Sequence, residues 1–264
     1  MVIRLNDEGE VILANEETIR YKATIAYDGT DFSGFQVQPS ERTVQGEMEA
    51  VLKKINKGKF IRLHPSGRTD AGAHAAGMVF HFDYTKKIPR EGLFKAINTL
   101  ISRDISLLKL ESVGDDFHAR YHAKAKTYIY RIHNHELRDP FKRNFVYHHP
   151  YQMDKDRVEK ALNILIGTHD FTSFCSTKTD KEDKVRTIYD IAVEHDKKSN
   201  EWEFIFYGNG FLYNMIRIIM GTVLPIADGR KEVEEMLDIL EARDRNAAGK
   251  TLSANGLCLE KVHY

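Results

Sequence analysis

The chain has 264 residues, of which 42% are hydrophobic and 30% charged, and its 39 basic residues balance 39 acidic ones. This composition is typical of a folded globular protein, and two cysteines without a CxxC spacing argue against a disulfide framework or a zinc site. No apolar run could span a bilayer and the acidic N-terminus lacks a signal-peptide pattern, so we expect a cytoplasmic protein without a membrane partner.

The first half of the chain alternates strand and helix patterns. Residues 21–27 alternate apolar and polar side chains, as in a half-buried strand. Residues 43–55 place apolar side chains at helical spacing, and Thr43 is the expected N-cap. The other expected elements of this half are strands at 60–63, 77–83 and 105–113 and a helix at 90–102.

The second half gives nearly the same succession. A strand at 124–133 precedes a helix that starts at Asp154 and reaches 166. The remaining expected elements are strands at 185–195, 201–207 and 256–263 and helices at 212–227 and 232–242. Each half therefore runs strand, helix, strand, strand, helix, strand, and the second half has one extra helix.

This order predicts an α+β fold of two ferredoxin-like (split βαβ) units. We expect their antiparallel sheets to be joined across a central cleft, with the helices on the outer face. The predicted organisation is an N-terminal extension at 1–19, an N-terminal catalytic half at 20–117 and a C-terminal half at 118–264.

The stretch PSGRTDAGAHAAG, residues 65–77, forms a loop that joins two predicted strands. Gly67 and Gly72 allow unusual backbone conformations and a close approach of substrate. Arg68 and Asp70 lie between these glycines. Residue types alone leave two interpretations open, since Asp70 could be a reactive carboxylate or could simply cap the turn.

Two further stretches favour chemistry on RNA. In FHARYHAKAKTYIYR, residues 117–131, basic and aromatic side chains interleave, which suits phosphates and unstacked bases. In GFLYNMIR, residues 210–217, Arg217 lies in an otherwise apolar helix. Because an unpaired buried arginine is costly, Arg217 needs a carboxylate, and we predict that its partner is Asp70.

Taken in order, the motifs resemble those of the TruA family of tRNA pseudouridine synthases. They are YDGT-x-F-x-G-F-Q-x-Q…TVQGE, SGRTDAGAHA-x-G, FHARY…Y-x-YRI, GTHDFTSF, FLYNMIR…GTVL and a final GL-x-L-x-x-V-x-Y, collinear over about residues 20–264. The chain departs from the family pattern at Phe35 (usually tryptophan), Ala73 (usually valine) and Met78 (usually glutamine), and it lacks the proline usually found near Leu252 or Ser253.

The resemblance implies that the protein isomerises uridine to pseudouridine at positions 38, 39 and 40 of the tRNA anticodon arm. In this reaction the N1–C1′ bond breaks, the uracil turns, and C5 joins C1′. The chemistry needs no cofactor and no metal. The family resemblance also implies a homodimer that binds one tRNA path across both subunits.

The resemblance also assigns roles to residues. Asp70 is the essential carboxylate, either as a nucleophile at C1′ or as a base that removes a sugar proton, and the sequence leaves both open. Arg217 orients Asp70 and keeps it ionised, and Arg68 assists base flipping. Tyr128 stacks on the uracil and takes part in proton transfer. The other expected substrate-binding residues are Leu257, Lys126 and Arg131.

Three other functions stay open at this point. A non-catalytic RNA-binding module would explain the aromatic and basic side chains but gives no reason for Asp70 and Arg217. A hydrolase could pair Asp28 with Asp70. A purely structural dimer would not need so many polar, glycine-rich motifs.

Overall fold

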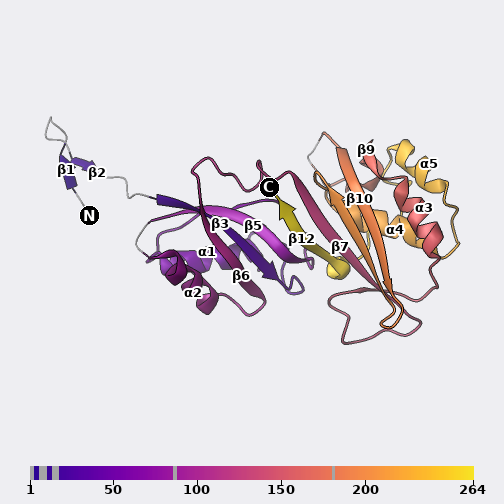
Figure 1. Ribbon diagram of the computed structural model, residues 1–264, viewed down its shortest axis with the longest axis horizontal. Helices are drawn as coiled ribbons and strands as arrows, with labels where there is room; N and C mark the ends of the chain where they lie inside the picture. The colour runs from indigo at the N-terminus through magenta and orange to yellow at the C-terminus, as the bar shows by residue number, and fades with distance from the viewer. Residues whose placement is uncertain (1–2, 6–10, 14–17, 86–87, 180–181) are drawn as a thin grey trace.

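The computed structural model describes residues 3–5, 11–13, 18–85, 88–179 and 182–264. One large, mostly antiparallel sheet and two groups of helices make it a mixed α+β protein (Figure 1). No helix in these ranges is long and apolar enough to cross a membrane. Most of the predicted extension at 1–19 lies outside the described residues, although β1 (Ile3–Leu5) and β2 (Val11–Leu13) pair antiparallel.

The N-terminal half contributes four strands and two helices to this architecture. The side chain of Thr43 accepts a hydrogen bond from the Gly46 N–H, which confirms the predicted cap. The strand expected at 60–63 is wrong, because these residues form no strand and pairing with β5 begins only at His64. The elements are β3 (Thr18–Tyr27), α1 (Val44–Ile55), β4 (His64–Pro65), β5 (His74–Thr85), α2 (Arg90–Leu100) and β6 (Ile105–Val113).

The C-terminal half follows the predicted order with two additional short strands. Asp154 caps α3 through hydrogen bonds from two N–H groups, as predicted. The helix expected to start at 212 begins at Met215, because Asn214 has a positive φ of 62° and ends the helical backbone there. The elements are β7 (Ala125–Asn134), β8 (Tyr147–His149), α3 (Lys155–Asn163), β9 (Gly167–Asp170), β10 (Val185–Asp196), β11 (Glu201–Gly208), α4 (Met215–Ala227), α5 (Glu235–Ala242) and β12 (Leu257–His263).

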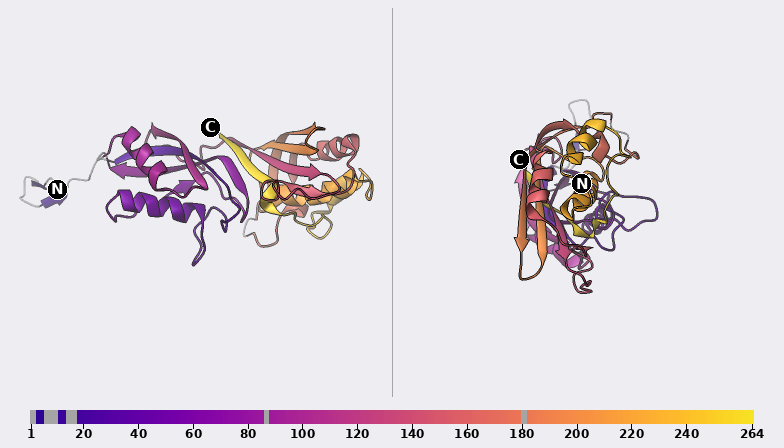
Figure 2. Two further views of the ribbon diagram at one scale, coloured as in Figure 1. Left: turned by 90° about the horizontal axis from the view of Figure 1, so that it is seen from below. Right: turned by 90° about the vertical axis from the view of Figure 1, so that its right-hand side faces the viewer.

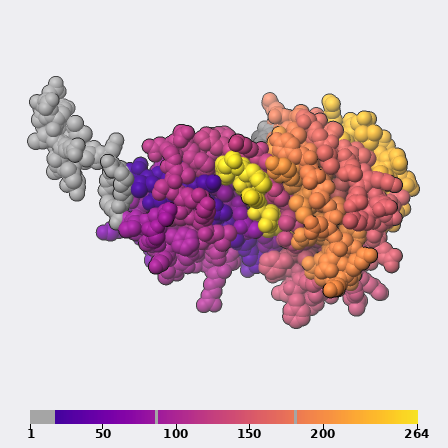
Figure 3. Space-filling view, in the orientation of Figure 1, coloured from indigo at the N-terminus to yellow at the C-terminus, as the bar shows by residue number. Residues whose placement is uncertain are grey.

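The two halves share one sheet. Its strand order is β6-β3-β5-β12-β7-β11-β10-β9, with β4 paired to β5 and β8 to β7. Strands β5 and β12 pair in parallel, with Cys258 opposite His74 and Leu259 opposite Ala75. Figure 3 shows β12 at the surface between the two halves. The halves are therefore joined by strand pairing, which corrects the expectation of two sheets that meet across a cleft.

The two faces of the sheet differ in what covers them. Ala23, Ile25 and Tyr130 are fully buried and belong to the core that the helices also build, and we call this the helix-covered face. Neighbouring positions such as Lys22 and Arg131 point the other way and are partly exposed, and we call this the open face. The end-on view in Figure 2 shows α4 and α5 gathered on one side of the strands.

Candidate functional site

The loop that carries Asp70 is held by the segment that follows β3. The Phe35 N–H donates to the Thr69 carbonyl at 3.2 Å, and the Gly72 N–H donates to the Phe32 carbonyl at 3.1 Å. Gly34 has a φ of +90°, and a Cβ there would lie 2.9 Å from the Thr69 carbonyl oxygen. Only glycine fits this close approach, so the loop's position depends on it.

A buried hydrogen bond fixes the residue next to Asp70. The hydroxyl groups of Tyr27 and Thr69 lie 2.7 Å apart, away from solvent. Burial raises the pKa of Tyr27 far above that of a free tyrosine, so this phenol stays protonated and can donate. The sequence motif YDGT contains this tyrosine, but sequence reasoning gave it no role in the site.

Arg217 meets Asp70 across the two halves of the chain, as predicted. Its Nη1 lies 2.8 Å from Oδ2 of Asp70 and 2.7 Å from Oδ1 of Asn214, and its Nε donates to the Leu252 carbonyl at 2.7 Å. The Asp70 and Arg217 side chains are only 16% and 17% exposed. A cation in the first turn of a helix opposes the helix dipole, so these acceptors are needed to hold it.

Tyr128 lies on the same face of the sheet as this ion pair. It projects from β7, is 8% exposed, and packs edge-on against Phe211 with ring centroids 5.3 Å apart. Burial and, to a smaller extent, the charge of Asp70 raise the pKa of its phenol well above the ordinary value. Tyr128 and Asp70 are therefore close enough to interact electrostatically.

The other predicted site residues fall into two groups. Lys126 is on the helix-covered face, and its Nζ donates to the Ser66 carbonyl at 3.0 Å, at the start of the Asp70 loop. Leu257 is buried on that face opposite Tyr130, and Arg68 is exposed on the loop itself.

Arg131, by contrast, is on the open face, where its Nε lies 2.6 Å from Glu203. The structure does not bring Arg131 to Asp70.

A separate hollow of about 390 Å³ lies on the open face, behind the Asp70 site. His74 lines it and holds two loops together, since its Nδ1 accepts from the Gly29 N–H at 3.0 Å and its Nε2 lies 2.8 Å from the Asn144 carbonyl. Both ring nitrogens are thus engaged in structural bonds. The other residues that line the hollow include Asp28, Arg131, Phe145 and Cys258. Asp70, Tyr128 and Arg217 do not line this hollow.

The arrangement can place a directed carboxylate beside an extruded base. Arg217 pairs with Asp70 and fixes its direction, while Tyr128 offers an aromatic surface near it. Asn214 was missed as a support for Arg217, although the motif FLYNMIR contains both. Within the described ranges, the one group of three side chains spaced to hold a metal consists of His64, His81 and His118, so Asp70 is not part of it.

Comparisons with known proteins show which proteins the chain is similar to. A family model described as tRNA pseudouridine synthase matches residues 23–122 and 161–264. The chain is 47% identical to tRNA pseudouridine synthase A of Latilactobacillus sakei subsp. sakei, over 94% of this chain and 99% of that protein. It is 50% identical to tRNA pseudouridine synthase A of Lacticaseibacillus casei, over 92% of this chain and 99% of that protein. Among solved structures, an archaeal box H/ACA sRNP Nop10-Cbf5 complex aligns with a TM-score of 0.36 and 12% identity, covering 86% of this chain and 59% of that one, which is too distant to carry an argument.

Proposed function

Because the chain belongs to the tRNA pseudouridine synthase family, we propose that Asp70 is the carboxylate on which its reaction depends. The protein isomerises uridine to pseudouridine in tRNA. The observation that carries the proposal is the ion pair between Asp70 and Arg217, mostly buried and close to Tyr128. Such a pair directs a carboxylate toward the place where glycosidic cleavage would develop positive charge at C1′.

The carboxylate has two chemical routes. As a nucleophile, Asp70 forms a bond to C1′ while the N1–C1′ bond breaks and N1 keeps the electron pair. The uracil then turns, C5 attacks C1′, the carboxylate leaves, and the C5 proton is lost. As a base, Asp70 removes the C2′ proton while uracil leaves, and the resulting glycal is attacked by C5 after reprotonation at C2′. Both routes need the carboxylate that Arg217 holds in place.

The neighbouring side chains complete the proposal. The target base is stacked within the arm and must be flipped out of it. Arg68 is exposed on the Asp70 loop, where it can assist flipping or fill the gap left behind. Tyr128 stacks on the uracil and takes part in removal of the C5 proton, with Leu257 packing on the base's other side and Lys126 holding the loop.

Finer points extend the same proposal. We place the target uridines at positions 38, 39 and 40 of the anticodon arm, the enzyme in the cytoplasm, and two chains in the active homodimer, all by family resemblance. We also propose that residues 20–117 and 118–264 are each a ferredoxin-like unit. The strand orders β6-β3-β5-β4 and β12-β7-β11-β10 support this. If the strands of each unit are numbered along the chain, both orders read 4-1-3-2, which is the order of a ferredoxin-like sheet.

The decisive experiment is tritium release from tRNA labelled at C5 of uridine. We expect release by the wild type and none by Asp70→Asn, with tRNA binding retained. Asp28→Asn is the matched control, because Asp28 accepts bonds from Thr30 within its own loop and should leave turnover within about tenfold. Binding without release by the wild type would favour a non-catalytic RNA-binding module, and free uracil would favour a hydrolase.

A further inference from the structure

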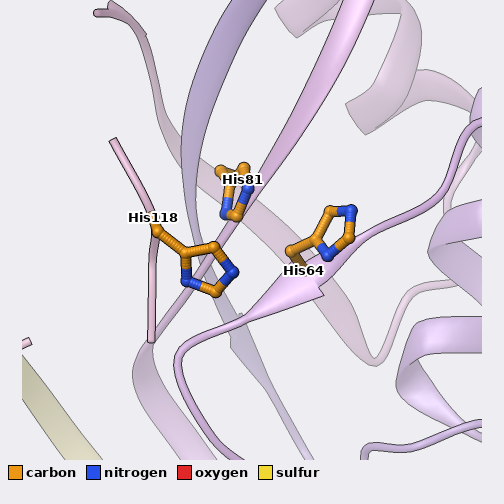
Figure 4. Close-up of side chains that lie close together, drawn as sticks. All are labelled: His64, His81 and His118. Atoms are coloured by element: carbon orange, nitrogen blue, oxygen red, sulfur yellow. The ribbon is translucent and has the colours of Figure 1, made fainter. Parts of the chain in front are cut away.

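Three histidines from distant parts of the chain meet on the open face, away from Asp70. His64 comes from β4, His81 from β5, and His118 from the segment between β6 and β7 (Figure 4). One ring nitrogen of each lies within 4.8 Å of the other two. The ring centroids of His64 and His81 are 4.8 Å apart, and those of His81 and His118 are 4.6 Å apart.

The hydrogen bonds of two of these rings argue against a metal. Nδ1 of His81 accepts from the Ala119 N–H at 3.1 Å, and Nδ1 of His118 accepts from the Arg120 N–H at 3.1 Å. A neutral imidazole has one acceptor nitrogen, so Nε2 of each ring carries the proton. A metal would need a free lone pair on Nε2. A metal-bound imidazole also donates a hydrogen bond through its other nitrogen, whereas Nδ1 of these two rings accepts one. The two rings therefore present N–H donors.

The surroundings favour an anion. Burial lowers the pKa of His118 most, and electrostatic interactions with two histidines, His64 and His122, and with the guanidinium groups of Arg20 and Arg120 lower it further. Burial also contributes most to lowering the pKa of His81, followed by His64, His118 and Arg20, whereas Asp83 raises it. Three carboxylates, those of Asp83, Asp115 and Asp116, act on Arg20, and Asp83 accepts two hydrogen bonds from it. The site therefore combines neutral N–H donors with two nearby guanidinium groups, those of Arg20 and Arg120.

An aromatic side chain borders the cluster. Tyr121 is 75% exposed, and its ring centroid lies 4.2 Å from that of His118. Donors beside an exposed aromatic ring suit a nucleotide, whose phosphate accepts hydrogen bonds and whose base stacks. His64 lies six residues before Asp70, so their Cα atoms are at most about 20 Å apart. One RNA arm can reach both places.

We propose that His64, His81 and His118 form an anion subsite that takes a backbone phosphate of the bound tRNA, with Tyr121 as the adjacent stacking surface. The inference rests on tRNA being the substrate. It assigns this cluster to substrate binding and not to chemistry, so its loss raises KM and leaves kcat unchanged.

The test uses substitutions that keep or remove one ring nitrogen at a time. In His118→Asn, Oδ1 still accepts the backbone N–H bonds but the Nε2 donor is gone. In His118→Gln, the amide nitrogen keeps a donor near the Nε2 position. We expect His118→Asn to raise the tRNA Kd about 3- to 10-fold at every salt concentration, with the melting temperature unchanged. His118→Gln should bind close to wild type, and His195→Asn on β10 is the matched control.

A double variant, His64→Ala with His118→Asn, should weaken binding further, while tritium release at saturating tRNA stays at the wild-type rate. Unchanged Kd in both His118→Asn and the double variant would overturn the proposal. If these variants do not fold, inorganic phosphate is titrated into the wild type instead. Shifted imidazole NMR signals of the cluster would support the proposal, and unshifted signals would overturn it. Binding of Zn²⁺ that raises the melting temperature and is lost in His118→Asn, with tRNA affinity unaffected, would replace it with a metal site. A failed Asp70 proposal would instead show as release by Asp70→Asn, which leaves this test untouched.

Discussion

Replacing Arg217 by alanine should damage stability and catalysis together. Removing one partner of a buried ion pair costs about 3–5 kcal/mol, because the other charge stays buried. The Asp70 and Arg217 side chains keep 16% and 17% of their exposure, so water offsets part of this cost. Loss of the bonds to Asn214 and the Leu252 carbonyl adds to it. We expect Arg217→Ala to lower the free energy of unfolding by about 3 kcal/mol.

A double-mutant cycle separates the ion pair from these other contacts. Asp70→Ala should cost less, about 2 kcal/mol, because Arg217 keeps two neutral acceptors. With both side chains removed, no buried charge is left unpaired, so the double variant should be about 2 kcal/mol more stable than the sum of the single effects predicts.

Urea unfolding measures all four proteins, and tritium release should fall at least about 100-fold in Arg217→Ala. Arg217→Lys is the control for charge, since one ammonium group cannot match the forked donors and should not restore full activity. Additive stabilities within about 0.5 kcal/mol would refute the reasoning, as would wild-type turnover in Arg217→Ala.

Three further predictions concern Tyr27 and Tyr128, near Asp70, and His81 of the histidine cluster. Tyr27→Phe removes the buried hydrogen bond to Thr69 and should lower the free energy of unfolding by about 1–2 kcal/mol. It should also change kcat more than KM. Equal urea midpoints and equal turnover would contradict this prediction. Tyr128→Ala should weaken tRNA binding by about 1–3 kcal/mol through lost stacking, whereas Tyr128→Phe should bind normally in a filter assay; equal losses would assign the effect to the hydroxyl. Burial lowers the pKa of His81 to about 4, below its unfolded value of about 6.5, so the unfolded state binds more protons between these values. Stability should therefore be full above about pH 6.5 and fall by about 1–3 kcal/mol as the pH drops toward 4, and urea unfolding of His81→Asn should show a flatter profile.

The sequence determined the local elements and the chemical identity of the site. Periodicity placed most helices and strands, because the apolar face of each element is written in its own residues. The caps Thr43 and Asp154 were predicted for the same reason. Because Arg217 lies in an apolar helix and needs a carboxylate partner, the sequence predicted its contact with Asp70, which is 147 residues away. The odd separation of Arg131 from Tyr128 puts the two on opposite faces of β7, and the alternation of a strand could have shown this.

Only the tertiary structure decided how distant segments meet. Pairing of β5 with β12 joins the halves into one sheet, and no local pattern specifies which strand lies beside another. Arg217 donates hydrogen bonds to Asn214 and to the Leu252 carbonyl. These bonds depend on how the loops that contain the two acceptors are placed around α4. The cluster of His64, His81 and His118 arises because β4, β5 and the segment after β6 converge. Contacts between residues far apart in the chain are set by packing of the whole core, which the sequence encodes only collectively.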